Sequence, residues 1–300
     1  MKSIDSLAVI SLVALIFAGC PGQRDAASRD GADSSAPDSD TTLPTDAVCL
    51  EGEHFVADGT ASIGGTPGAS GTRDSDDART AASPDSREVT GLRWQAHDGC
   101  ERFVIDISHG AAAANVTAQV LRDDGVVRIT LRDIERAAQE ATDASFNGQL
   151  AKGAYVVRSP DGPFVFVDLH LAAPAEAHVA LLQDPARVLV DLRPGGRPLP
   201  SPPVTTQRVV VLGPRHGTAS YPLKITGYSR TFESNVVARL EQNGANVTEQ
   251  FTTATGWVDA WGYFTITIRT GPQGPINLHV GEYSARDGTW EGARLNLDMR

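Results

Sequence analysis

Beyond residue 100 the chain alternates apolar and polar residues with a period of two, in short runs rich in valine, isoleucine and leucine. Because successive side chains of a β-strand point to opposite faces, this alternation predicts strands that bury one face. Runs of this kind predict strands at residues 103–107, 126–131, 164–169, 187–192, 208–212, 221–228, 235–241, 262–269, 276–285 and 294–299. Their regular spacing predicts an all-β fold of antiparallel β-sandwiches.

Turn-forming residues separate several of these runs. Asn243-Gly244 and Asp123-Asp124-Gly125 are typical of hairpin turns, because asparagine, aspartate and glycine tolerate positive φ. Segments 159–163 and 286–288 have the same character. One stretch differs: residues 133–144 place apolar residues at helical spacing and predict a short helix over one end of a sheet.

A segment rich in proline and glycine, residues 194–203, interrupts the alternation. Proline fixes φ and lacks a backbone N–H, so such a segment favours an extended, semi-rigid conformation over helix or central strand. We interpret it as a linker between two domains. The prediction is one β-sandwich over residues 48–193 and a second over residues 204–300, each large enough for a core of its own.

The first twenty residues have the character of an export signal. Lys2 precedes an apolar run at residues 7–17 that is too short to span a bilayer, and Ala18-Gly19 stand before Cys20. The order Phe17-Ala18-Gly19-Cys20 resembles the bacterial lipobox, with Phe17 where leucine is usual. The resemblance implies a signal peptide at residues 1–19 and lipidation, by palmitate or a similar acyl chain, at Cys20. The alternative is an ordinary signal peptide with an incidental cysteine.

Two low-complexity segments follow. Residues 20–47 consist largely of Asp, Ser, Ala, Thr, Pro and Gly, and carry more acidic than basic residues. Such a composition cannot bury enough apolar surface to offset the entropy of ordering, so we expect a disordered acidic tether. Residues 59–86 are also rich in small and polar residues, and we expect a long loop there.

Charge and cysteine content limit the function. The formal net charge of −11 and a pI of about 5.0 argue against nucleic acid as a partner, because phosphate backbones are bound by clustered Lys and Arg. The chain has three cysteines. If Cys20 carries lipid, Cys49 and Cys100 remain, and in an oxidising compartment they form one disulfide or stay as two buried thiols.

Two segments resemble known families. Residues 90–106, which include the turn His97-Asp98-Gly99, together with the strand at 187–192, are similar to AMIN-like domains of bacterial envelope lipoproteins. This resemblance covers residues 49–193. It implies a small β-sandwich that works as a wall-facing binding module, without catalysis of its own.

The C-terminal part resembles the immunoglobulin-like domain of bacterial spore germination proteins. The similarity runs from residue 204 to the end and is carried by residues 209–214, 221–228, 231–236, 261–264 and 283–288. It implies a second β-sandwich to which no catalytic residues are assigned. The pairing of the two domains behind a lipobox implies an envelope lipoprotein whose folded part lies outside the cytoplasm.

One cluster contains residue types that bind metals. His97, Asp98, Cys100 and Glu101 lie within five positions, but no second set of ligands with recognisable spacing accompanies them. Asp98 also fits a turn, Cys100 a disulfide, and Arg102 a counter-ion for Glu101. We therefore expect no metal and no cofactor.

Three strand aspartates and one histidine are of residue types that act in catalysis. Asp106, Asp168 and Asp191 each follow apolar residues in a predicted strand, where alternation turns them toward solvent or toward a facing arginine. His170 lies between two leucines and is expected on the outward face of its strand. Because nucleophile and phosphate-loop motifs are also lacking, we expect no enzyme.

Three aromatic residues are the candidate ligand contacts. Trp257, Trp261 and Tyr263 lie close together in the C-terminal part, where exposed rings would stack on sugars or anchor a protein. The alternative is core packing, since sandwiches commonly bury a tryptophan.

The function expected from sequence is binding. We expect a lipid-anchored, non-enzymatic envelope protein that binds peptidoglycan glycan or another envelope protein. The alternatives are an accessory or assembly subunit that pairs through exposed strand edges, and a hydrolase with an unrecognised site.

Overall fold

The structure is a computed structural model that describes residues 49–50, 55–61, 63–64, 87–108, 115–182 and 185–300. Cys20, the signal peptide, the acidic tether and most of the expected loop after residue 64 lie outside these residues. Within the described part the chain is built from strands joined by turns and three short 3₁₀ turns, so the predicted all-β fold is confirmed. No helix there is long and apolar enough to cross a membrane.

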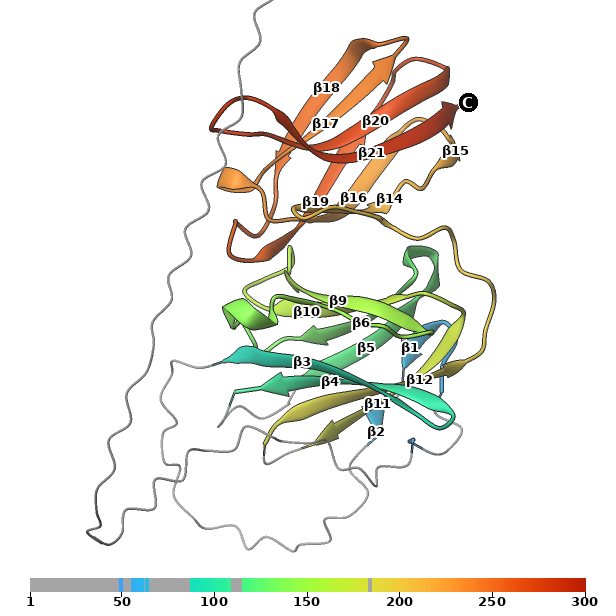
Figure 1. The fold of residues 1–300 in the computed structure, drawn as a ribbon, viewed down its shortest axis with the longest axis vertical. Helices are drawn as coiled ribbons and strands as arrows, with labels where there is room; N and C mark the ends of the chain where they lie inside the picture. The colour runs from blue at the N-terminus through green and yellow to red at the C-terminus, as the bar shows by residue number, and fades with distance from the viewer. Residues whose placement is uncertain (1–48, 51–54, 62, 65–86, 109–114, 183–184) are drawn as a thin grey trace, which may run out of the picture. The chain divides into compact units, whose positions relative to one another are not determined.

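The N-terminal sandwich, which we define as the sheets formed by residues 59–194, has two facing layers (Figure 1). One layer has the order β1-β5-β6-β10-β9, with β8 also paired to β9, and the other has the order β2-β11-β12-β4-β3-β7. The strands are β1 (Gly59–Ala61), β2 (Ile63–Gly64), β3 (Glu88–His97), β4 (Cys100–Ile107), β5 (Val116–Leu121), β6 (Val126–Leu131), β7 (Arg136–Ala137), β8 (Asp143–Ser145), β9 (Ala151–Arg158), β10 (Val165–Leu171), β11 (Ala175–Leu182) and β12 (Arg187–Pro194).

The C-terminal sandwich, residues 204–299, also has two layers. One has the order β19-β16-β14-β13 and the other β15-β21-β20-β17-β18. The strands are β13 (Val204–Thr205), β14 (Val209–Gly213), β15 (Gly217–Ala219), β16 (Leu223–Ser229), β17 (Asn235–Gln242), β18 (Ala245–Thr253), β19 (Trp261–Ile268), β20 (Gly274–Tyr283) and β21 (Trp290–Met299).

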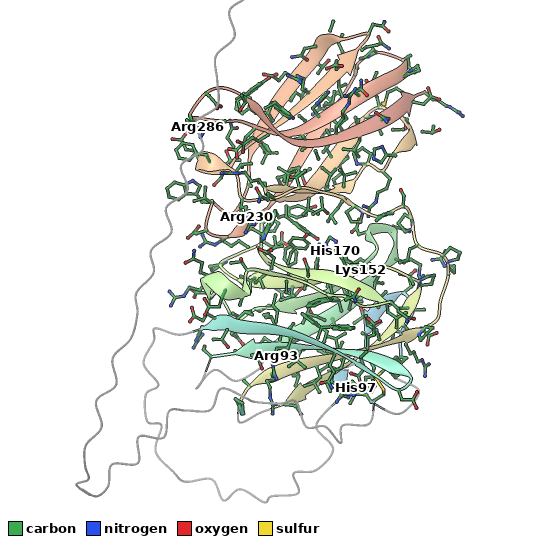
Figure 2. All side chains as sticks on the ribbon, in the orientation of Figure 1. Arg93, His97, Lys152, His170, Arg230 and Arg286 are labelled. Carbon is green, nitrogen blue, oxygen red and sulfur yellow. A yellow bond between two sulfur atoms is a disulfide. The ribbon has the colours of Figure 1, made fainter. Side chains whose placement is uncertain are left out.

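Each sandwich encloses its own core, filled by the inward residues of both layers (Figure 2). Phe103, Ile105, Ile129, Leu169 and Leu192 are among the largest fully buried side chains of the N-terminal core. The C-terminal core is built in the same way around Ile225, Leu240, Phe264, Ile268, Leu278 and Leu295. Burial of one face of each strand is what the period-two alternation predicts.

The expected helix at residues 133–144 is wrong. This stretch contains β7, the 3₁₀ turn η2 (Gln139–Ala141) and β8. β7 pairs with β3 in parallel, and β8 pairs with β9. The small alanine face offers a helix little apolar burial, whereas pairing with neighbouring strands satisfies the backbone hydrogen bonds.

Other differences have the same origin in strand pairing. β5, β9, β11 and β18 carry much alanine, threonine or charge, and alternation did not single them out. The expected loop at 59–86 is wrong at its start, because β1 pairs with β5 and β2 pairs with β11. The turn at Asn243-Gly244 has positive φ at both residues and joins β17 to β18.

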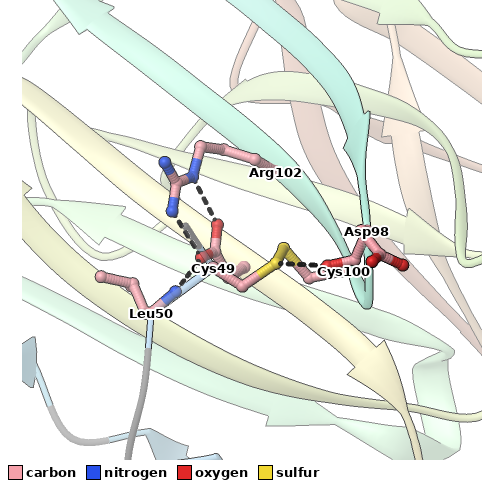
Figure 3. Close-up of a disulfide and its surroundings, with 6 residues drawn as sticks. Cys49, Leu50, Asp98, Cys100 and Arg102 are labelled. Carbon is pink, nitrogen blue, oxygen red and sulfur yellow. Dashed lines mark hydrogen bonds and ion pairs between the residues drawn. A yellow bond between two sulfur atoms is a disulfide. The ribbon is translucent and has the colours of Figure 1, made fainter. Parts of the chain in front are cut away.

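A disulfide and a buried ion pair fasten the segment at Cys49 and Leu50 to the N-terminal sandwich (Figure 3). Cys49 is bonded to Cys100 at the start of β4. The Leu50 backbone N–H donates to Asp191 Oδ2 over 2.6 Å. Arg102 Nε and Nη2 donate to the same carboxylate, each over 2.7 Å. Two adjacent anchors therefore hold this segment.

We predict that the double variant Cys49→Ser/Cys100→Ser lowers the free energy of unfolding by about 3–4 kcal/mol, because the closed loop spans 51 residues. Urea unfolding of the wild type and the variant, each with and without dithiothreitol, measures the effect. Reduction should destabilise only the wild type. Equal stability of the two oxidised proteins would contradict the prediction.

Candidate functional site

The three candidate aromatics lie in different surroundings. Trp257, in the connection between β18 and β19, is 49 % exposed. Trp261, the first residue of β19, is 1 % exposed, and Tyr263 is half-buried. Only Trp257 therefore presents a largely open ring to solvent, and the expectation that Trp261 contacts a ligand does not fit its burial.

Trp261 is buried because it lies where the two sandwiches meet. Its ring packs edge-on against Tyr155 of β9, with 5.1 Å between ring centroids, and the Arg230 guanidinium lies 4.7 Å above it. The indole Nε1–H donates to Asp143 Oδ1 over 3.0 Å. Next to it, β19 pairs in parallel with β9 over two residues. Trp261 thus fixes the C-terminal sandwich to the N-terminal one.

We call the apolar cluster around Trp261 the joint. It contains Val126, Val157 and Phe166 from the N-terminal sandwich, and Val210, Leu212, Tyr228 and Trp261 from the C-terminal sandwich. These side chains lie on the outward faces of their sheets, away from the two cores. The layer that contains β6, β9 and β10 and the layer that contains β14, β16 and β19 are therefore each covered on both sides. The linker is thus not the only connection between the sandwiches.

A charged group lies inside the joint. Arg128 Nε and Nη2 donate to Asp168 Oδ1 and Oδ2 over 2.8 and 2.7 Å. Tyr228 OH donates to Asp168 Oδ2. Burial, and then the charge of Asp168, raise the pKa of Tyr228 well above its usual value. Burial lowers the pKa of Arg128, but the adjacent carboxylate outweighs it and raises that pKa overall. The phenol of Tyr228 therefore stays protonated and the guanidinium of Arg128 stays charged.

His170 borders this group. It lies on the outward face of β10, as expected from alternation, but the C-terminal sandwich covers that face and leaves the residue 7 % exposed. Burial, together with the charges of Arg215 and Arg128, lowers its pKa to about 4, although the charge of Asp168 acts in the opposite direction. The imidazole is therefore neutral at pH 7.

The strand aspartates are structural. Asp106 pairs with Arg93, Asp168 with Arg128 and Asp191 with Arg102, so each carboxylate faces an arginine, one of the two arrangements expected. Each carboxylate is thus neutralised by its own guanidinium. This arrangement suits a strand ion pair and leaves no free general acid or base among the three.

Glu101 does not form the expected ion pair with Arg102. Its carboxylate accepts hydrogen bonds from the backbone N–H groups of residues 149–151 and from Trp94 Nε1, whereas Arg102 pairs with Asp191. Glu101 thus ties β4 to the segment before β9. Within the described residues no three His, Cys, Asp or Glu side chains are grouped as metal ligands would be.

Exposed apolar side chains are concentrated elsewhere. Every large hydrophobic residue that is exposed in the described part belongs to the C-terminal sandwich: Phe232, Val247, Phe251, Trp257, Val258 and Tyr283. Phe232, Trp257 and Val258 form what we call the aromatic end, with 6.4 Å between the centroids of Phe232 and Trp257. The 3₁₀ turn η3 (Phe232–Ser234) and the β18–β19 connection bring them to the same end of the sandwich (Figure 1).

A second group lies along the edge of the same sandwich. β18 ends its sheet and exposes Val247 and Phe251, the latter by 79 %. Tyr283 of β20 donates from its OH to Glu249 Oε2 over 2.9 Å. Its ring packs edge-on against Trp290 of β21. Sequence reasoning missed this group because β18 itself was not predicted. Val247 and Phe251, which lie four residues apart in an otherwise polar segment, were the feature that could have predicted a strand there.

We predict that Asp168→Ala lowers the free energy of unfolding by about 3 kcal/mol or more, because it leaves Arg128 and Tyr228 without their buried acceptor. Asp106→Ala is the matched control. It removes a similar ion pair that is about a quarter exposed, and should cost about 1 kcal/mol or less. Urea unfolding measures both variants, and equal effects would contradict the prediction.

We also predict a pH effect from His170. Below pH 6.5 the unfolded chain gains a proton at this imidazole that the folded chain refuses until about pH 4, so stability falls as the pH drops between these values. The loss approaches about 3 kcal/mol. His170→Phe should therefore show a flatter stability profile between pH 6.5 and 4. Parallel profiles of wild type and variant would refute this assignment.

Part of the chain is similar to a known domain family. No curated protein and no solved structure matches it. Residues 208–289 match the family model described as the immunoglobulin-like domain of bacterial spore germination. The match runs from the start of β14 to just before β21, so it lies within the C-terminal sandwich and includes the aromatic end.

Proposed function

We propose that this chain is an exported, lipid-anchored, non-enzymatic protein of the bacterial cell envelope that binds cell-wall glycan through its C-terminal sandwich. The proposed organisation is a signal peptide at residues 1–19, lipidated Cys20, a tether at 20–47, an AMIN-like domain at 48–193, a linker at 194–203 and an immunoglobulin-like domain at 204–300. The matched domain family supports a binding or structural role for the last of these.

One observation carries the proposal. All exposed large hydrophobic side chains of the described residues belong to the C-terminal sandwich. Grouped exposed apolar residues are uncommon on a monomeric surface and mark interaction sites. At the aromatic end, Phe232 and Trp257 offer ring faces on which the apolar face of a sugar can stack. Glu233 and Asp259 are exposed and follow Phe232 and Trp257 closely in the sequence, and their carboxylates can accept hydrogen bonds from hydroxyl groups.

An envelope protein is the second candidate partner, and β18 favours it. As the last strand of its sheet, β18 leaves one row of backbone N–H and C=O groups without a partner strand in the described part of the chain. Val247 and Phe251 project from it. An extended segment of a partner would add to such an edge and bury both side chains. In this arrangement the protein would be an accessory subunit.

We predict that purified peptidoglycan retains the mature protein at low salt and that Phe232→Ala/Trp257→Ala reduces retention about tenfold or more, since stacked rings contribute about 1 kcal/mol or more each. Phe251→Ser is the matched control, because it removes an exposed ring from the β18 edge. No retention of the wild type would remove the glycan proposal. Loss of a co-purifying protein in Phe251→Ser alone would favour the accessory role.

Lipid anchoring has a separate test. Cells expressing the full chain with radiolabelled palmitate should label the wild type and not Cys20→Ser, because the acyl acceptor is the Cys20 thiol. The wild type should sediment with membranes, whereas the variant should be released from them. Label that persists in Cys20→Ser would contradict the anchor.

A further inference from the structure

A cavity of about 460 Å³ lies between the N-terminal sandwich and the linker. β8, β9 and the end of β10 form one wall, and residues 199–205, including β13, form the other. Its volume falls within the range of small-molecule sites. Of the candidate site residues considered from the sequence, His170 alone lies in it, and the aromatic end is formed by other elements.

The linker lines one side of this cavity with conformationally restricted residues. Leu199, Pro200, Pro202 and Pro203 line it, and Leu199 also packs against the N-terminal core. Proline restricts φ, so this wall loses little entropy when a ligand enters. On the opposite wall Tyr155 is held between His170 and Trp261, at centroid distances of 4.9 and 5.1 Å. The cavity therefore exists before binding.

His170 contributes the surface of its ring to this cavity. The residue lines the cavity and is 7 % exposed. Its Nε2 is shielded from solvent and has no hydrogen-bond partner among the described residues. The imidazole therefore meets a ligand as a ring surface next to Tyr155.

A cation stands on the same wall. Lys152 lines the cavity and donates from Nζ to the Gly148 carbonyl oxygen over 2.6 Å, which leaves two of its three N–H groups. Within the described residues no carboxylate lies at ion-pair distance from it. Figure 2 shows Lys152 and His170 close together on this side of the N-terminal sandwich. The site thus combines one positive charge with aromatic and proline surfaces.

We propose that this cavity is a binding site for a small molecule that combines an apolar ring with a carboxylate. The ring would lie between Tyr155 and the linker prolines, next to the imidazole of His170, and the carboxylate would face Lys152. This site is independent of the glycan proposal, because it uses the N-terminal sandwich and the linker instead of the aromatic end.

The test is fluorine NMR of para-trifluoromethylphenylacetate titrated into the mature protein. Binding should be in the range of about 0.1–1 mM, as befits a fragment. Ala172→Trp, which places a large ring at an exposed residue of the cavity wall, should abolish it. Ala285→Trp makes the same change on an exposed residue of the other sandwich and should leave binding unchanged.

A further variant tests the charged contact. Lys152→Met should weaken binding of the carboxylate about threefold or more and leave binding of the neutral analogue para-trifluoromethylbenzyl alcohol unaffected. The proposal is overturned if the probe does not bind at concentrations up to about 10 mM. It is also overturned if the probe still binds to Ala172→Trp, or if Trp257→Ala removes binding.

Peptidoglycan retention, measured in the same variants, reports separately on the aromatic end.

Discussion

The carboxylate of Asp168 is the contact on which the arrangement of the described chain depends. It lies fully buried on the outward face of β10, receives two hydrogen bonds from Arg128 on the adjacent β6, and accepts a third from Tyr228 of the C-terminal sandwich. A buried charge is stable only when it is paired and hydrogen-bonded. Asp168 therefore requires both its own sheet and the second sandwich, and it favours one mutual position of the two. The apolar side chains of the joint exclude water from Asp168, so its carboxylate depends on these hydrogen bonds.

This constraint separates structural from interacting aromatic residues. Trp261 and Tyr228 are buried in the joint, whereas Phe232 and Trp257 remain open at the aromatic end, although Trp257 and Trp261 are only four residues apart. The same constraint creates the cavity beside His170, because the linker must pass over the end of β9 and β10 to reach β13. The burial of His170 and of Trp261 thus follows from how one sandwich is held on the other.

Much of the fold could be predicted from residue pattern. The runs at residues 126–131 and 187–192 became β6 and β12 because every second side chain is apolar and enters the N-terminal core, and that spacing is a local property. The Asn243-Gly244 turn is likewise local, since both residues adopt positive φ. The helix expected at residues 133–144 failed because its backbone pairs with β3 and β9, which lie far away in sequence or follow later. Strands such as β18, polar along most of their length, are defined by their neighbours, and no local signal sets their register.

The sequence by itself determined the all-β class, the resemblance of the C-terminal part to an immunoglobulin-like domain, and a shortage of catalytic motifs. These follow from periodicity and from motif residues that lie next to one another in the chain. Only the tertiary structure decided that Trp261 is buried while Trp257 is exposed, that Arg102 pairs with Asp191 and not with Glu101, and that His170 lines a cavity. Alternation assigns each side chain to one face of a strand. Whether that face meets solvent or a second sheet depends on contacts between residues 40 to 120 positions apart, which a local pattern does not encode.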